Sequence, residues 1–282
     1  MTPKFPRKLR IAVAAPAGPA ARETVAAGMA ALRRAGAEAE AMPHLGDGGA
    51  LAHLSAPDEA RAADIDDAVA AGFDIIWCAR GGCGSMRILD LIDWTMLRAS
   101  STVIAGFSDI TALHWAMLRH GTENFLAAPM MKFLAEAEDP VTADSLRAAL
   151  AGEPAALRLD ALRPGRISGP PLPGNLAVAS ALCGTPHFPD TEGRIVVLEE
   201  VGEAPYRIDR MLTQLRLAGA FDRCAGVVFG NFTDCGDPSG VEAVLRDFTG
   251  RVACPVFTGL AHGHQLPFLS LSGRQTLSVS PR

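Results

Sequence analysis

Three polar residues that could together activate a hydroxyl nucleophile stand far apart in the chain. Ser108 lies in GFSDIT, Glu199 in VVLEEVGE and His264 in LAHGH. A serine hydroxyl becomes an effective nucleophile when a histidine accepts its proton and a carboxylate stabilises the imidazolium that forms. The order serine, glutamate, histidine is also that of the α/β-hydrolases. Because GFSDI lacks the second glycine of their G-x-S-x-G turn, a standard α/β-hydrolase is disfavoured.

The segment around Ser108 has the pattern of a strand, a turn and a helix. Residues 102–105 (TVIA) suit a short strand, and residues 110–120 place apolar side chains at helical spacing before Gly121. Ser108 should therefore precede a helix, where unpaired backbone N–H groups and the helix dipole would stabilise an oxyanion. On this segment alone, a serine that only caps the helix is the commoner case.

A glycine-rich turn, RGGCGS at 80–85, follows another apolar, strand-like segment at 73–79. Glycines permit positive φ and close approach of the backbone, and successive N–H groups in such a turn can bind an anion. The turn could hold a phosphate or a tetrahedral oxyanion, or it could be an ordinary strand-to-helix connection. The dinucleotide fingerprint fails because Arg87 stands where its third glycine would be, and the sequence has no Walker A lysine.

Five segments together resemble the LD-carboxypeptidase family, the serine peptidases that include muramoyltetrapeptide carboxypeptidase and the microcin C immunity proteins. They lie in register between about Ile11 and His264 and read RGGCGSMRILD, AGFSDITALH, PGNLAVASALCGTP, VVLEEVGEAPYRIDRMLTQL and GLAHGH. The resemblance implies an α/β fold. In it, a flavodoxin-like N-terminal domain with a mostly parallel sheet carries the nucleophile, and a smaller, β-rich C-terminal α/β domain carries the glutamate and the histidine.

By this resemblance Ser108 is the nucleophile, Glu199 the carboxylate and His264 the base, and the backbone amides of Gly82 and Asp109 form the oxyanion hole. The implied activity is a serine carboxypeptidase that releases the C-terminal D-alanine of murein tetrapeptide in peptidoglycan recycling, without metal or cofactor. One alternative is a microcin-immunity type of amidase that acts on aminoacyl-nucleotide analogues. The other is a non-catalytic two-domain protein that binds a ligand. We also expect the protein to form a homodimer. The molecule that it binds should be a small peptide, its substrate.

Composition excludes several other classes of protein. With 282 residues, 49% of them hydrophobic and 20% charged, the chain can bury a substantial core. A net charge of −5 without a basic run argues against nucleic acid or an anionic membrane as partner. MTPKFPRKLR lacks the apolar core of a secretory signal, so we expect a cytoplasmic protein. The six cysteines show no C-x-x-C spacing and suggest reduced thiols.

The order of the segments predicts two domains. Residues 1–151 alternate strand-like and helix-like segments and should form the N-terminal α/β domain. Prolines cluster in residues 152–173, which we predict to be a linker. Residues 174–282 should form the C-terminal domain. Its predicted helices are 175–183 and 206–218, and its predicted strands are 194–199 and 225–230.

Two pairs of residues in the second half are ambiguous. Glu199 and Glu200 end an apolar strand, where carboxylates are usually solvated, and strand alternation does not tell which of them points inward. The family pattern selects Glu199. His262 and His264 have a spacing that would also suit a metal pair, but the sequence has no third-ligand cluster such as H-E-x-x-H.

Several residues are candidates for contact with the substrate. Arg80, Arg207 or Arg210 could bind a substrate carboxylate, although surface arginines are usually only solvated. Cys83 stands where relatives often carry tyrosine, and LPGN, which ends at Asn175, replaces a paired-glycine run. We expect Cys83 and Asn175 to shape the pocket.

Overall fold

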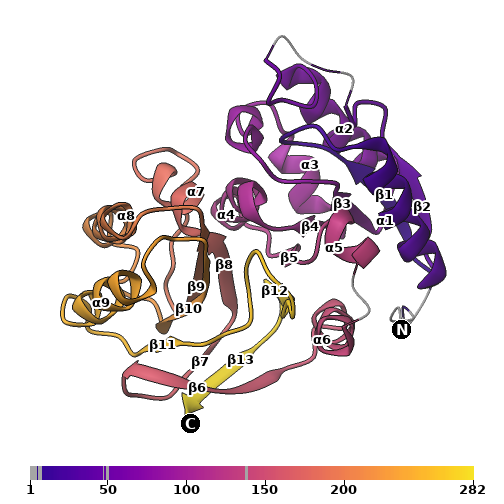
Figure 1. Ribbon diagram of the computed structural model, residues 1–282. Coiled ribbons are helices and arrows are strands. Elements are labelled where there is room, and N and C mark those ends of the chain that lie inside the picture. The colour runs from indigo at the N-terminus through magenta and orange to yellow at the C-terminus, as the bar shows by residue number, and fades with distance from the viewer. Residues whose placement is uncertain (1–4, 6–7, 47, 49–50, 137–138) are drawn as a thin grey trace.

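Two β-sheets flanked by helices make up the molecule (Figure 1). The computed structural model describes residues 5, 8–46, 48, 51–136 and 139–282. The first sheet contains β1 (Arg10–Ala14), β2 (Glu38–Ala41), β3 (Ile75–Cys78), β4 (Val103–Gly106), β5 (Phe125–Ala127) and β12 (Leu271–Ser272). The second contains β6 (Ala155–Arg163), β7 (Ile167–Gly169), β8 (Pro171–Asn175), β9 (Ile195–Val201), β10 (Gly226–Thr233), β11 (Val256–Thr258) and β13 (Leu277–Pro281). The helices are α1 (Arg22–Arg34), α2 (Asp58–Ala70), α3 (Trp94–Ala99), α4 (Thr111–Arg119), α5 (Met131–Glu136), α6 (Pro140–Leu150), α7 (Leu176–Ala181), α8 (Pro205–Leu217) and α9 (Pro238–Thr249).

The first sheet has the strand order β12-β5-β4-β3-β1-β2, and its first five strands in the chain are parallel. Crossover helices cover both faces of such a sheet, so its inner strands are apolar throughout. β3, with the sequence IIWC, is buried at every position. In the second sheet, β8, β9, β10 and β11 are parallel, and β6 runs antiparallel to β11. The predicted α/β fold, with a mostly parallel first sheet and a β-rich second part, is confirmed.

The chain returns to the first sheet near its end. β12 pairs antiparallel with β5, so that Leu271 lies opposite Ala127. Just before β12, the Phe268 amide donates to Thr142 Oγ1 of α6 at 2.8 Å. The segment that follows His264 is thereby bound to the first sheet and to α6.

The prediction of a linker at 152–173 is wrong, because these residues form β6, β7 and most of β8. Prolines indicated a linker since proline cannot donate a hydrogen bond within a sheet. Here Pro171 and Pro173 lie in β8, at the edge of the second sheet, where a missing donor is tolerated. Pro164 and Pro170 lie in the connections between strands. The predicted domain boundaries stay a prediction.

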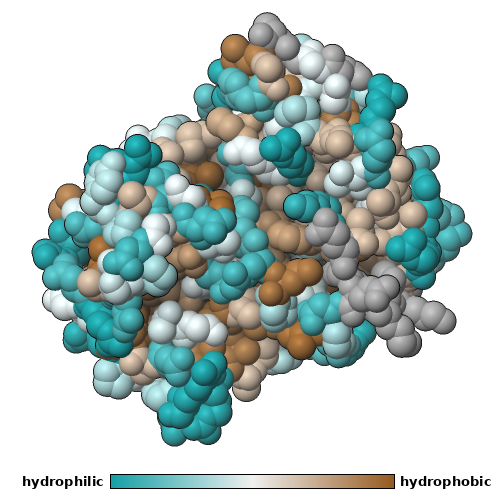
Figure 2. Space-filling model, viewed as in Figure 1, coloured by the Kyte–Doolittle hydropathy of each residue, from teal (hydrophilic) through white to brown (hydrophobic). Residues whose placement is uncertain are grey.

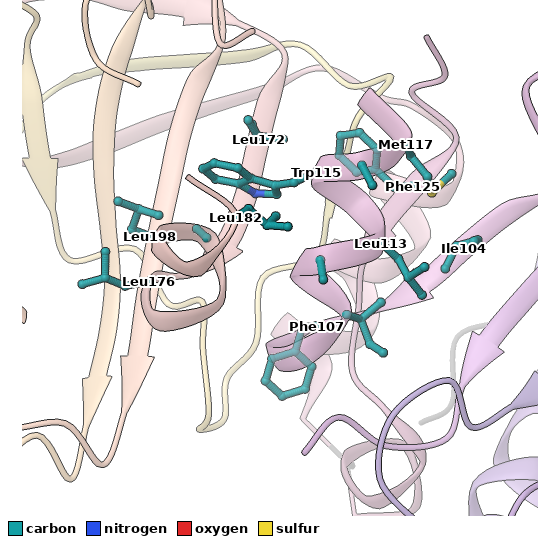
Figure 3. Close-up of a cluster of buried hydrophobic side chains, with 14 of the residues drawn as sticks. Ile104, Phe107, Leu113, Trp115, Met117, Phe125, Leu172, Leu176, Leu182 and Leu198 are labelled. Carbon is teal, nitrogen blue, oxygen red and sulfur yellow. The ribbon is translucent and has the colours of Figure 1, made fainter. Parts of the chain in front are cut away.

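Helix α4 joins the part of the molecule that contains the first sheet, here the first part, to the part that contains the second sheet, here the second part. Trp115 on this helix is fully buried and points toward Leu172 and Leu182 of the second part (Figure 3). Its indole N–H donates to the Pro173 carbonyl at 3.1 Å. A Cβ at Gly174 would lie 2.8 Å from the indole nitrogen, so the contact requires glycine there. On the face shown in Figure 2, hydrophilic residues cover the outer rims, and hydrophobic ones are visible along the junction.

Trp115 and Trp77 offer a matched test of this junction. Both indoles are fully buried and both donate to a proline carbonyl, but Trp77 binds Pro129 within the first part. We expect Trp115→Phe and Trp77→Phe each to lower the free energy of unfolding by about 1–3 kcal/mol, measured by urea denaturation. For the hydrolase that the resemblance implies, only Trp115→Phe should also slow turnover by folded protein, because it loosens the contact between the two parts. Equal slowing by both variants would contradict this role.

Candidate active site

Ser108 lies at a sharp turn between β4 and α4. It begins a short helical turn, Ser108–Ile110, and has a φ of 62°, in the left-handed region that residues other than glycine seldom adopt. A Cβ at Gly106 would lie 3.0 Å from side-chain atoms of both Cys78 and Ile110, so the turn needs glycine there. The predicted strand, turn and helix are all present. The turn sets the Ser108 side chain at the helix start, beyond the carboxyl end of β4.

The structure brings Ser108, His264 and Glu199 together. His264 Nε2 lies 3.1 Å from Ser108 Oγ, and His264 Nδ1 lies 2.7 Å from Glu199 Oε2. Glu199 is only 1% exposed. Because a carboxylate can only accept, Nδ1–H donates to Glu199, which leaves Nε2 free to accept the Ser108 proton. This is the arrangement that general-base activation of a serine requires.

The loop that carries His264 is held in place by backbone contacts and by a buried histidine. His262 Nδ1 donates to the Leu269 carbonyl at 2.8 Å, and burial lowers the pKa of His262. The His262 carbonyl accepts from the Asn231 amide at 2.8 Å. Gly263 has a φ of 140°, and a Cβ there would lie 3.1 Å from Glu199 Oε2. Tight packing thus fixes the approach of the loop to Glu199.

His262 and His264 do not share a site. The Leu269 carbonyl binds one imidazole, whereas Glu199 and Ser108 bind the other. In the described ranges, no group of three or more histidine, cysteine, aspartate or glutamate side chains is placed to hold a metal ion.

The glycine-rich turn packs directly against Ser108. A Cβ at Gly81 would lie 3.1 Å from Ser108 Oγ and 3.3 Å from the Asp109 amide nitrogen. Gly82 and Gly84 have φ values of 104° and 135°, which a side chain would strain. Glycine therefore keeps the space beside the hydroxyl open. The turn lies where oxyanion donors are expected, and the role of the Gly82 and Asp109 amides stays a prediction.

Four of the five candidate substrate-binding residues lie in different settings, and the fifth, Arg210, is exposed with its guanidinium over the Tyr206 ring. Asn175 is buried and lines a small cavity of about 10 Å³ together with Ser108 and Glu199. Its side chain accepts from the Val178 amide at 3.2 Å, so it caps α7. The other three are exposed: Arg80 donates to the Pro19 carbonyl, Cys83 lies on the glycine-rich turn, and Arg207 contacts Glu203 and Tyr206. None of the contacts described for these three involves Ser108, Glu199 or His264.

Glu200 is only 2% exposed, although carboxylates at the end of a strand are usually solvated. Its carboxylate accepts from Asn175 Nδ2 at 2.9 Å and from the amides of Ala177 and Val201 at 2.7 and 2.8 Å. Burial raises the pKa of Glu200. Glu200 thus binds the first turn of α7, while its neighbour Glu199 binds His264.

Comparison with known proteins identifies the family. A model of the LD-carboxypeptidase N-terminal domain matches residues 11–127, and a model of the C-terminal domain of the same family matches residues 168–277. The chain belongs to the LD-carboxypeptidase family. A Streptomyces coelicolor protein named as a candidate carboxypeptidase is 38% identical over 264 residues, which are 90% of this chain and 85% of that protein. This LD-carboxypeptidase is therefore an enzyme of the serine carboxypeptidase class.

Several similar proteins have names that state a substrate or a bound ligand. The murein tetrapeptide carboxypeptidase of Pseudomonas aeruginosa is 29% identical, over 90% of this chain and 88% of its own. The muramoyltetrapeptide carboxypeptidase of Oxalobacter formigenes has a similar structure, with a TM-score of 0.86, 26% identity, and coverage of 97% of this chain and 95% of that one. MccF bound to glutamyl sulfamoyl guanosine superimposes with a TM-score of 0.85 over 99% and 95% of the chains. At 19% identity, this last likeness shows the fold alone. Within the part of this LD-carboxypeptidase that the structure describes, no helix is long and apolar enough to span a membrane.

The two neighbouring glutamates should respond differently to the same substitution. Glu199→Gln keeps an acceptor for His264 but removes the charge that stabilises the imidazolium, so turnover should fall while stability changes little. Glu200→Gln places an amide NH2 among three donors, so we expect a loss of about 1–3 kcal/mol in the free energy of unfolding. Folded Glu200→Gln protein should retain most of its turnover. Denaturation curves and initial rates separate the two effects, and the reverse outcome would show that the roles are exchanged.

The buried His114 should make stability depend on pH. It donates through Nε2 to the Ile104 carbonyl at 3.1 Å, and burial lowers its pKa from 6.5 to about 3. Between these values the unfolded chain binds a proton that the folded protein does not. Stability should therefore fall as the pH drops below about 6.5, by ~1.4 kcal/mol per unit for this group.

Urea denaturation at pH 7.5 and 5.0 checks this dependence. His114→Phe should flatten the pH dependence of the free energy of unfolding, although it lowers stability at both pH values by leaving the Ile104 carbonyl unpaired. The exposed His53 provides the control, and His53→Phe should leave the dependence as it is in the unmodified protein. An unchanged slope in His114→Phe would contradict the argument.

Proposed function

We propose that Ser108, His264 and Glu199 are the catalytic triad of a serine LD-carboxypeptidase that releases the C-terminal D-alanine of murein tetrapeptide. The observation that carries the proposal is the continuous path from Ser108 Oγ through the two nitrogens of His264 to the buried Glu199 carboxylate. The proposed substrate follows the named relatives, and the proposed role is peptidoglycan recycling.

Acylation would begin with attack of Ser108 Oγ on the carbonyl carbon before D-alanine. His264 Nε2 accepts the hydroxyl proton, and the negative charge then moves to the carbonyl oxygen. The amides of Gly82 and Asp109 would donate to this oxygen. Because they are oriented before the reaction starts, they would stabilise the negative charge without a cost of reorganisation. Breakdown of the tetrahedral intermediate breaks the C–N bond, and His264 gives its proton to the leaving amine of D-alanine.

Deacylation repeats the same proton transfers with water. His264 Nε2 accepts a proton from a water molecule that attacks the ester, and it then returns the proton to Ser108 Oγ. The Glu199 carboxylate, bonded to His264 Nδ1, would stabilise the imidazolium in each half-reaction. The Phe107 ring, whose centroid is 4.9 Å from that of His264, shields one side of the imidazole from water.

Release of D-alanine from purified murein tetrapeptide tests the proposal. The unmodified protein should release one D-alanine per tetrapeptide, followed with a D-amino-acid oxidase assay. Ser108→Ala and His264→Ala should each lose on the order of 10⁴ to 10⁶ in rate, because the triad works as a unit. The exposed residues Ser101 and His53 supply matched controls, and Ser101→Ala and His53→Ala should keep full activity.

The same preparation distinguishes the alternatives. Hydrolysis of a glutamyl sulfamoyl nucleotide without release of D-alanine would indicate the microcin-immunity type of amidase. Failure to hydrolyse either substrate, with no labelling of Ser108 by a serine-directed phosphonate, would indicate a protein that only binds its ligand. Substantial turnover by Ser108→Ala would rule out the serine mechanism itself.

A further inference from the structure

The peptide unit between Gly84 and Ser85, at the end of the glycine-rich turn, is held at both of its polar atoms. Arg61 Nη1 donates to the Gly84 carbonyl at 3.0 Å, and the Ser85 amide donates to Asp109 Oδ2 at 2.8 Å. Arg61 is 1% exposed and Asp109 6%. Asp109 directly follows Ser108, so one side of this peptide is bonded to the turn that carries the nucleophile.

Arg61 joins three separate segments of backbone. Besides Gly84, its guanidinium donates to the carbonyls of Ala56, at 3.1 Å, and of Pro16. Its remaining nitrogen pairs with Asp58. A buried guanidinium is costly unless its donors are satisfied, and here each nitrogen has an acceptor. The side chain therefore ties the β1–α1 loop and the start of α2 to the glycine-rich turn.

Asp58 supports this arrangement from the surface. Arg87, which follows the turn, donates to both oxygens of Asp58, with Nε at 3.0 Å from each and Nη2 at 2.6 Å from one. This bond lowers the pKa of Asp58, so its carboxylate stays charged opposite Arg61.

The glycine-rich turn needs such restraint because of its composition. Glycine has access to both signs of φ, so a peptide unit next to one can rotate at little steric cost. Gly84 has a φ of 135°, and a Cβ there would lie 3.0 Å from Arg61 Nη1 and 2.6 Å from Leu54 Cδ2. The backbone therefore packs directly on the guanidinium. Rotation of the Gly84–Ser85 peptide would break the bonds to Arg61 and Asp109 and displace the turn that carries Gly82, two residues before Gly84.

We propose that Arg61 is a positioning residue for catalysis. Together with Asp109 it locks the Gly84–Ser85 peptide, and thereby holds the Gly82 amide toward the oxyanion that forms at Ser108. Arg61 acts from beneath the turn and does not touch the substrate. The inference rests on the proposed serine mechanism, and it adds a residue whose effect is on the tetrahedral intermediate rather than on substrate binding.

Arg61→Lys is the first test. One ammonium group cannot reproduce the fork of a guanidinium that binds three carbonyls and a carboxylate. We expect kcat, expressed per active site titrated with a phosphonate, to fall about 10- to 100-fold, with KM changed less than about twofold. The inhibition constant of a boronic acid that adds to Ser108 as a tetrahedral anion should rise by the same factor as kcat falls. A purely structural role would reduce the number of titratable sites and leave kcat per site unchanged.

Arg33 provides the matched control. It also binds a backbone carbonyl in the first part of the molecule, that of Ala39 at 2.7 Å, but on β2 and away from the turn. Arg33→Lys should keep kcat within twofold of the unmodified protein.

A second variant keeps the inference testable if Arg61→Lys folds poorly. Asp109→Ala removes the other restraint on the same peptide and leaves the Asp109 backbone amide in place. It should lower kcat without raising KM, and Asp109→Asn, which retains an acceptor for the Ser85 amide, should restore much of the loss. Because Arg61 and Asp109 hold one peptide unit, the double variant Arg61→Lys/Asp109→Ala should be scarcely slower than the slower single variant.

Two outcomes would overturn the inference. One is unchanged kcat per titrated site in Arg61→Lys, and the other is full multiplication of the two single effects in the double variant. These results differ from failure of the proposed function, in which Ser108→Ala itself would retain hydrolysis.

Discussion

The hydrogen bond between His264 Nε2 and Ser108 Oγ spans 156 positions of sequence and joins two differently organised sheets. Proton transfer requires the two atoms, 3.1 Å apart, to stay within hydrogen-bond distance. The two sheets must therefore keep a fixed position relative to each other. Helix α4 meets this constraint most directly. It begins beside Ser108 and buries Trp115 against the second part, so one rigid element both presents the Ser108 hydroxyl and holds the second sheet. The return of the chain to the first sheet after His264 provides a second attachment.

Two neighbouring buried carboxylates in the second part bind different partners. The two carboxylates are adjacent near the end of β9, and their opposite directions follow from the alternation of side chains along a strand. One supports the imidazole and the other binds the start of α7. In the first part, Arg61 is also buried and hydrogen-bonded, and its partners are mostly backbone carbonyls. In both places, ionic groups orient a segment near Ser108. Hydrogen bonds can do this because they depend on angle, whereas apolar contacts are largely non-directional.

Local patterns in the sequence predicted the strand, turn and helix around Ser108, and the strand that precedes the glycine-rich turn at 80–85. Each depends on short-range spacing, and the resemblance to the family selected the three residues that the structure brings together. The strands at 155–175 were missed because prolines normally interrupt a sheet, and no local pattern shows that a strand will lie at an edge. The two-residue strand β12 is too short to have a pattern of its own.

The buried roles of Glu200 and Arg61 were missed for a related reason. Their partners are largely backbone groups of distant segments. Because nearly every residue type has the same backbone groups, the sequence does not show which of them will bind a given side chain. Arg61 nevertheless left a signal. It falls four positions before Ile65 and seven before Ala68, on the buried stripe of α2, where a charged residue must find internal partners.

The pairing of β12 with β5 has a consequence for the order in which the protein is made. Residue 271 follows residue 127 by 144 positions, so at ~5–20 residues per second the ribosome supplies the partner of β5 roughly 7–30 s after β5 itself. Throughout that interval the outer edge of β5 offers unpaired N–H and C=O groups to any neighbouring chain. His264 is synthesised only seven positions before β12, so the nascent chain acquires the proposed base and closes this edge at nearly the same moment. Until then the nascent protein lacks that histidine and is exposed to aggregation.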